Sequence, residues 1–265
     1  MKQSKIRMGL FFLAPVLLGT LVFFAVPFSM VVGYSFRMGS RFVWFENYVK
    51  VIRSESFQLA AWNTVRFLAL GVPFILWISL SIALLLHSCP WFHQLCSNTM
   101  LLPLVLPLAS IVLFVDALTP EAAMEGPGAF WVLLLLYLWK NCGYLALLFL
   151  AARNMIPEEY YQYARLSGAG VLQQLWYITL PQLRPTLGFA AVIAVINSFK
   201  SYREAFLLGG KHPTESIYLL QHFLNNNFEN LNYPRLSVAS VLLALPILMT
   251  VVVVLIWWRR QSDEA

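Results

Sequence analysis

The residues of this chain that could act on a solute are polar side chains that interrupt long apolar stretches. Two lie in one stretch and four recur at helical spacing in another, namely Lys140, Asn141, Asn197, Lys200, Ser201 and Glu204. An ionisable group at membrane depth is costly, so such groups usually face a protein interior or a wet cavity and mark solute or ion pathways. We therefore predict that these six residues line a translocation pathway.

Structural explanations compete with this prediction. Buried charges need partners, so Lys140 could pair with Asp116 or Glu204 and hold two helices together. The pathway and the ion pair are equally open for Lys140. Lys200 and Arg203 could instead extend to the outer membrane interface, as long basic side chains do, and for these two the interface is favoured.

Catalytic motifs are missing from the sequence. The segment 209–212 reads Gly-Gly-Lys-His, which lacks both the glycine spacing of a phosphate-binding loop and the hydroxyl residue that holds Mg²⁺. Neither a His-Glu-x-x-His metal motif nor a Gly-x-Ser-x-Gly nucleophile motif occurs. We expect no catalytic residue, no cofactor and no metal in this chain, and we expect no hydrolysis of ATP by it.

The composition is that of an integral membrane protein. Hydrophobic residues make up 60% of the chain and charged residues 11%, whereas soluble domains have about 25% charged residues. Because a helix needs about 20 mostly apolar residues to cross the hydrocarbon core, such stretches predict spans. We expect an all-α integral membrane fold in one domain, residues 1–265, with six transmembrane helices at about 8–36, 67–86, 95–115, 129–152, 185–208 and 236–258.

The basic residues predict the orientation of these spans. Lys2, Lys5 and Arg7 precede the first span and Arg259-Arg260 end the last one, which favours cytoplasmic positions for both termini. Four basic residues in the first external loop, 37–64, act against this assignment. The net charge of +6 is scattered at membrane boundaries, which indicates contact with lipid headgroups and not with nucleic acid.

The connector between spans four and five, 153–184, is expected to be cytoplasmic and to have local structure. Pro157 followed by two glutamates predicts a helix start, and Gly168 predicts its end because glycine readily adopts the left-handed conformation. Leu172, Leu175 and Trp176 predict a second short helix that Pro181 and Pro185 break. The tyrosines of the first helix suit a protein interface or, equally well, the membrane surface.

A resemblance decides between these two uses of the connector. Gln162-Tyr163-Ala164, then Gly168, then Ile178-Thr179-Leu180-Pro181 have a spacing that resembles the EAA loop of ABC-importer permeases. The stretch 156–169 matches that pattern at Ile156, Pro157, Glu159, Tyr161, Ala164, Gly168 and Ala169. It departs from the pattern at Gln162, Tyr163 and Ser167, where the family has Glu, Ala and Asp. Two acidic contacts of the family are thus replaced by neutral groups, which bond more weakly.

Other segments are similar to the carbohydrate-type permeases of the maltose and glycerol-phosphate group. They are Leu13-Ala14-Pro15, Phe45-Glu46-Asn47-Tyr48, Asn63-Thr64 and Gly209-Gly210 with Pro213 and Thr214. The resemblance covers nearly the whole chain. It implies a permease subunit, in the cell's inner membrane, of an ATP-driven, binding-protein-dependent importer of a sugar or sugar derivative that works by alternating access.

The resemblance also implies partners and contact residues. The partners are a second permease subunit, an ATPase dimer that carries ATP and Mg²⁺, an external solute-binding protein and the bilayer. The implied ATPase-coupling residues are Glu159, Tyr160, Tyr161, Gln162, Tyr163, Ala164, Ser167, Gly168 and Ala169. A different class is the alternative: a secondary transporter driven by an ion gradient, with Lys140 and Asp116 as its coupling pair.

Overall fold

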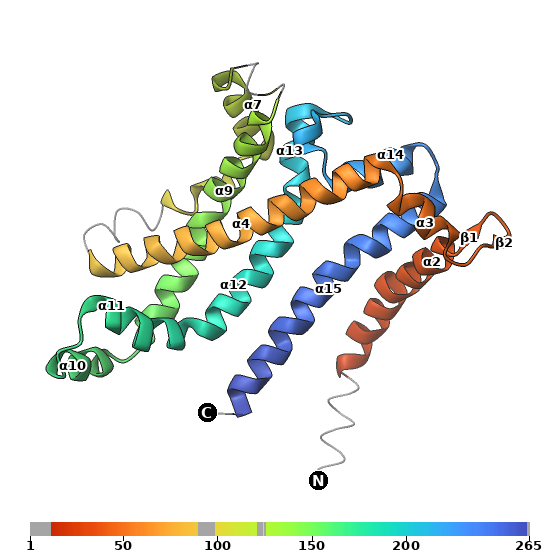
Figure 1. The fold of residues 1–265 in the computed structure, drawn as a ribbon. Coiled ribbons are helices and arrows are strands. Elements are labelled where there is room, and N and C mark those ends of the chain that lie inside the picture. The colour runs from red at the N-terminus through yellow and green to blue at the C-terminus, as the bar shows by residue number, and fades with distance from the viewer. Residues whose placement is uncertain (1–11, 90–98, 121–123, 125, 264–265) are drawn as a thin grey trace, which may run out of the picture. The chain divides into compact units, whose positions relative to one another are not determined.

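The computed structural model describes residues 12–89, 99–120, 124 and 126–263, and nearly all of them are helical (Figure 1). The chain divides into two compact units, one formed by Met1–Gln58 with Phe223–Leu245 and the other by Leu59–His222 with Pro246–Ala265. The expectation of a single domain over residues 1–265 stays a prediction.

The first unit contains an apolar helix, a short hairpin and a short helix. The apolar helix runs over Phe12–Ser35 and includes η1 (Leu21–Ala25) and α2 (Val26–Ser35). The antiparallel strands β1 (Arg37–Met38) and β2 (Arg41–Phe42) and helix α3 (Glu46–Ile52) follow. The buried Asn47 side chain fixes this junction, because its Nδ2 donates to the carbonyls of Ser35 at 3.0 Å and Arg37 at 2.9 Å.

The second unit holds the helices that matter for function. In chain order these are α4 (Glu55–Ser88), which begins in the first unit, α6 (Leu102–Val105), α7 (Leu108–Leu118), α9 (Gly128–Asn154), α10 (Glu158–Leu166), α11 (Val171–Gln174), η2 (Leu175–Thr179), α12 (Leu180–Lys200), α13 (Tyr202–Gly209) and η3 (Glu215–Ile217). Helices α14 (Leu220–Glu229) and α15 (Tyr233–Asp263) each contribute residues to both units.

Helix α9 is the centre of the second unit. The side chain of Tyr137 is fully buried, its ring packs edge-on against Phe67, and its hydroxyl donates to the carbonyl of Ala194 at 2.9 Å. Gly143 on the same helix allows the backbone of Met100 to come so close that a Cβ there would lie 2.0 Å from the Met100 carbonyl oxygen. Both contacts join α9 to its neighbours at the middle of its length.

Within the described residues, the expected membrane spans are confirmed as helices at five places. Helices long and apolar enough to cross a membrane occupy Phe12–Ser35, Glu55–Ser88, Gly128–Asn154, Val171–Gly209 and Tyr233–Val254. The start of the first expected span, the basic N-terminus and the start of the third expected span lie outside the described residues. The count of six is not confirmed and stays a prediction.

The third expected span, 95–115, is not one continuous helix in its described part. Helix α6 ends at Val105, Leu106 has an extended ψ of 138°, and α7 begins at Leu108. Pro107 explains the interruption, since a proline disfavours helical geometry in the residue before it and has no N–H to donate. The sequence analysis correctly identified this stretch as apolar, but it did not predict that Pro107 divides it into two helices.

Helix α4 begins at Glu55, twelve residues before the expected start of span two. Its early polar residues are compatible with a buried helix because they bond to the segment after α13. Asn63 Nδ2 donates to the carbonyl of Tyr218 at 3.1 Å, and Thr64 Oγ1 accepts from the backbone N–H of Leu220 at 2.9 Å. Long-range bonds of this kind leave no local sequence pattern.

The expectation that Pro181 and Pro185 break the second connector helix is wrong. Helical structure is continuous from Val171 to Lys200, with Pro181 in the first turn of α12 and Pro185 inside it. The wide π-type turn η2 lies directly before Pro181, and turns of this kind accommodate prolines by changing the local hydrogen-bond register. The connector and span five therefore form one helical segment.

His222 at the start of α14 is buried among the rings of Tyr202, Phe206 and Tyr218. Its Nδ1 accepts from the backbone N–H of Leu219 at 3.1 Å. Burial, together with the nearby His212, lowers the pKa of His222 to about 4, so the ring is neutral at physiological pH. It is a packing residue of the segment after α13.

The close approach at Gly143 gives a test of the packing of α9. We expect Gly143→Ala to lower the thermal stability of the purified protein, because overpacking of this kind costs about 1–3 kcal/mol. Gly33→Ala is the matched control, since Gly33 is also helical and a Cβ there meets nothing within 4 Å. Equal melting temperatures for the two variants would contradict the described contact.

Candidate functional site

A polar cavity of about 390 Å³ lies between α9, α12 and α13. Its lining residues are Leu104, Lys140, Asn141, Tyr144, Ile193, Asn197, Lys200 and Glu204. Five of the six residues expected to line a pathway are in this set. Ser201 is the exception: its side chain is buried and its hydroxyl donates to the carbonyl of Asn197 at 3.2 Å.

An ion pair crosses one side of this cavity. Lys140 Nζ lies 2.6 Å from Glu204 Oε1, with 29% of the lysine side chain and 4% of the glutamate side chain exposed. Asp116, the other partner that the sequence left open, is exposed on α7 and makes no ion pair with any described residue. The Lys140–Asp116 pair on which the secondary-transporter alternative depended is therefore not formed.

An amide and phenol network forms another wall. Asn197 Nδ2 donates to the hydroxyl of Tyr144, and that hydroxyl donates to Asn141 Oδ1 at 3.4 Å. Asn141 Nδ2 in turn donates to the carbonyl of Tyr137 at 2.7 Å. Because these bonds run from α12 to α9, they hold the polar groups of the cavity in place.

The sequence prediction missed three residues of this cavity, Leu104, Tyr144 and Ile193. Tyr144 and Ile193 could have been found from helical spacing, since Tyr144 lies four residues after Lys140 and Ile193 four residues before Asn197. Leu104 belongs to α6, and nothing in its local sequence indicates that this turn reaches the cavity.

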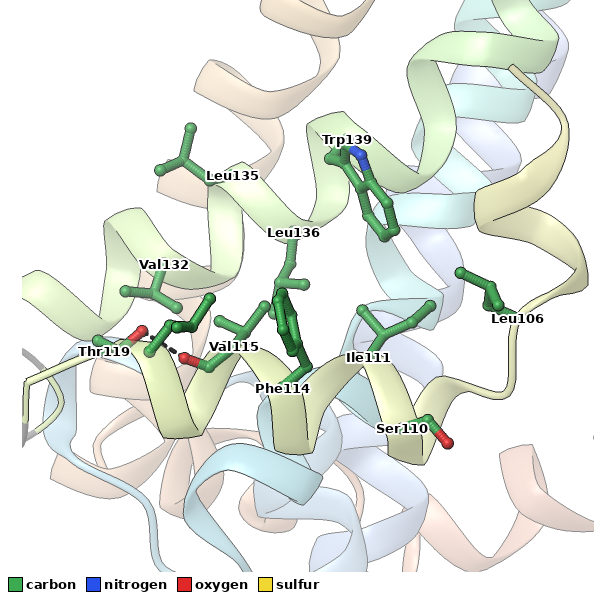
Figure 2. Close-up of a pocket in the computed structure, with 11 residues that line it drawn as sticks. Leu106, Ser110, Ile111, Phe114, Val115, Thr119, Val132, Leu135, Leu136 and Trp139 are labelled. Atoms are coloured by element: carbon green, nitrogen blue, oxygen red, sulfur yellow. Dashed lines mark hydrogen bonds between the residues drawn. The ribbon is translucent and has the colours of Figure 1, made fainter. Parts of the chain in front are cut away.

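A larger but apolar cavity of about 640 Å³ lies between α7 and α9 (Figure 2). Leucine, isoleucine, valine and aromatic side chains line it, and Thr119 and Leu106 lie at its two ends in this view. Its polar groups are few: the Thr119 hydroxyl, for example, donates to the Val115 carbonyl at 2.7 Å. Such a surface suits lipid or an apolar helix, so the smaller polar cavity is the better candidate for a hydrophilic solute.

The second candidate site is the connector at the other end of α12. Helix α10 begins directly after Pro157 and ends at Leu166, as the sequence predicts to within one residue. Gly168 has φ +81°, and the backbone N–H groups of Gly168 and Ala169 donate to the carbonyls of Arg165 and Ala164 at 3.0 and 2.9 Å. This is the Schellman arrangement that closes many helices.

Six of the nine expected coupling residues are exposed, namely Glu159, Tyr160, Gln162, Tyr163, Ser167 and Gly168, while Ala164 and Ala169 are half-buried. Tyr163 is 69% exposed. Tyr161 differs from the expectation of an outward apolar surface, because only 5% of it is exposed. Its hydroxyl lies 2.9 Å from Thr179 Oγ1 and the Arg153 guanidinium stacks 4.0 Å above its ring. Tyr161 therefore anchors α10 to the rest of the unit.

The exposed apolar surface continues beyond the Gly bend. Val171, Leu172, Trp176 and Tyr177 on α11 and η2 are 83%, 71%, 66% and 81% exposed. The sequence predicted this amphipathic piece but not Val171 and Tyr177 as part of it. Apolar side chains that nothing in the described chain covers indicate a contact surface.

Comparisons with known proteins agree with this arrangement. Residues 61–264 match the family described as the binding-protein-dependent transport system inner membrane component. The sulfoquinovosyl glycerol transport system permease protein SmoG of Agrobacterium fabrum is 29% identical over 237 residues, which cover 80% of this chain and 76% of that protein. The trehalose/maltose transport system permease protein MalF of Thermococcus litoralis is 26% identical, over 99% of this chain and 97% of that protein.

The fold has a counterpart among solved structures. A chain from a bacterial alginate ABC transporter, in complex with a periplasmic protein bound to an alginate pentasaccharide, superposes with a TM-score of 0.82 at 21% identity. The match covers 98% of this chain and 97% of that one. Since the family model spans more than half of the sequence, this chain belongs to the family of binding-protein-dependent transport system inner membrane components.

Proposed function

We propose that this chain is a membrane-spanning permease subunit of an ATP-driven importer for a sugar or sugar derivative. The observation that carries the proposal is the continuous helical segment Val171–Gly209. One end carries the exposed connector surface, and the other end carries Asn197, Lys200 and Glu204 of the polar cavity. Figure 1 shows α10 and α11 at one end of α12 and α13 at the other.

This continuity supports mechanical coupling. Asn197 lies about 26 residues after Val171, or roughly 40 Å along a helix at 1.5 Å per residue. Because α10 is anchored through Tyr161 and Thr179 to the start of α12, a force on the connector acts on the helix that bears the cavity. The chain supplies the moving element, and chemical energy comes from elsewhere.

The expected partners are the proteins that supply the energy and the solute to this chain. An ATPase dimer carrying ATP and Mg²⁺ binds the connector surface, a second permease completes the pathway, and an external binding protein delivers solute. Both termini face the cytoplasm in this arrangement. The relatives support the solute class, since their names include maltose, trehalose, arabino-oligosaccharides, sulfoquinovosyl glycerol and sn-glycerol-3-phosphate.

Gly168 tests the connector. We expect Gly168→Asp to leave the protein inserted but to reduce co-purification of the ATPase subunit and ATP hydrolysis stimulated by the binding protein, because a charged side chain at φ +81° disturbs both the bend and the docking surface. Gly170→Asp is the matched control. It adds the same charge at φ −71°, at the N-cap of α11, where Asp is favourable. Full stimulated hydrolysis in Gly168→Asp would refute the coupling role.

Gln162 tests the strength of the same contact. We expect Gln162→Glu to increase retention of the ATPase subunit in a pull-down, because a carboxylate restores the charge-assisted bond that the family pattern contains. Gln173→Glu, which makes the same change beyond the Gly bend, should have no such effect. Unchanged or weaker retention for Gln162→Glu counts against a contact at this position.

Lys140 tests whether its ion pair also serves transport. We expect Lys140→Met to reduce the yield of folded complex in size-exclusion chromatography, because it strands the Glu204 carboxylate at a cost of about 3–5 kcal/mol. Adding Glu204→Gln should restore the yield but not solute uptake in proteoliposomes. Lys200→Met, at an exposed lysine without an ion partner, is the folding control. Normal uptake by the double variant would make the pair purely structural.

A further inference from the structure

Glu204 presents an acceptor that no described residue satisfies. Its Oε1 is bound by Lys140, whereas Oε2 is buried and has no hydrogen-bond partner in the described part of the chain. Buried polar atoms without partners are rare, because each costs the desolvation of that atom without return. Glu204 is 3% exposed and lines the polar cavity, but Oε2 itself is covered, so a solute donor reaches this atom when the carboxylate turns toward the cavity.

Lys200 presents the complementary group. It lines the same cavity one helical turn before Glu204, it is exposed, and it makes no ion pair or hydrogen bond with a described residue. Its ammonium has three donors and no acceptor. The cavity thus contains one carboxylate already neutralised by Lys140 and one further ammonium, so its surplus charge is positive.

The remaining polar groups leave this charge unbalanced. Asn141, Tyr144 and Asn197 are neutral and hydrogen-bonded to one another, and Leu104 and Ile193 supply apolar surface. A cationic solute would meet net repulsion, and a neutral solute would gain no charge attraction from the exposed Lys200 ammonium. An anion with adjacent hydroxyl groups matches both the ammonium and the unsatisfied Oε2.

We propose that this cavity binds a sugar that carries an acidic group, such as a uronate, a sugar phosphate or a sugar sulfonate. The acidic group contacts the Lys200 ammonium, and a ring hydroxyl donates to Glu204 Oε2 once that carboxylate turns toward the cavity. A volume of about 390 Å³ is at the small end of known ligand sites, about 300–1,000 Å³. It suits one or two sugar rings. This inference rests on the proposed import function and adds the charge of the solute to it.

The test uses the complete chain in its assembled transporter, reconstituted in nanodiscs, and measures binding by calorimetry. The probes are D-glucuronate, glucose 6-phosphate and sulfoquinovose, each compared with D-glucose. We expect at least one acidic sugar to bind at least tenfold more tightly than glucose. Lys200→Gln should then weaken that acidic sugar roughly tenfold or more, as removal of a hydrogen bond to a charged group does, and leave glucose unchanged.

Arg203→Gln is the control, because Arg203 is exposed on the same stretch of chain but does not line the cavity. It removes the same net charge and should change acidic-sugar binding less than twofold. The inference is overturned if no acidic sugar binds more tightly than glucose, or if the two variants weaken binding equally. Tight glucose binding with ATP-driven uptake would leave the import function intact, whereas failure to assemble with an ATPase would reject that function itself.

Discussion

The contact between the Lys140 ammonium and the Glu204 carboxylate is the most buried ion pair in the described part of the chain. The two atoms are 2.6 Å apart and join α9 to α13 within the apolar helices. Each group alone would be expensive at this depth, because a charge removed from water needs a partner or a route back to it. A movement of α13 away from α9 therefore requires water or a solute to replace the lost partner.

The helical segment Val171–Gly209 carries the connector surface at one end and Glu204 of this ion pair near the other. The connector surface on α10, α11 and η2 is exposed, and the wide turn at Leu175–Thr179 allows the chain to continue through Pro181 and Pro185 into α12. In the proposed mechanism, a force on the connector acts through α12 on α13, which carries Glu204 of the ion pair. The neutral hydrogen-bond network of Asn141, Tyr144 and Asn197 joins α9 to α12 beside this ion pair.

Local sequence signals predicted the elements whose ends are marked by special residues. Helix α10 follows from Pro157 and Gly168. Helix α9 was expected at 129–152 and is observed at Gly128–Asn154, because a long apolar run occupies most of it. The cavity residues followed from the cost of charges at membrane depth together with helical spacing. These signals depend only on the residues of one helix.

Features that depend on other parts of the chain were not predictable in this way. The sequence analysis assigned Tyr161, with the other tyrosines of α10, to an exposed surface, but Arg153 and Thr179 cover it. The sequence could not choose between Asp116 and Glu204 as the partner of Lys140, because both lie on other helices. Helix α4 extends to Glu55 because remote backbone groups satisfy its polar residues, and the effect of a proline depended on its surroundings: Pro107 interrupts a helix, whereas Pro181 does not.

The central claim is that ATP acting on the connector changes access to the polar cavity. The direct measurement is labelling of Asn197→Cys by a membrane-impermeant maleimide, in an assembled transporter whose three native cysteines are replaced by serine. Proteoliposomes are labelled from either side, with and without a non-hydrolysable ATP analogue on the cytoplasmic side. The account predicts that the accessible side changes when the nucleotide binds. Labelling from the same side at the same rate in both conditions would contradict it.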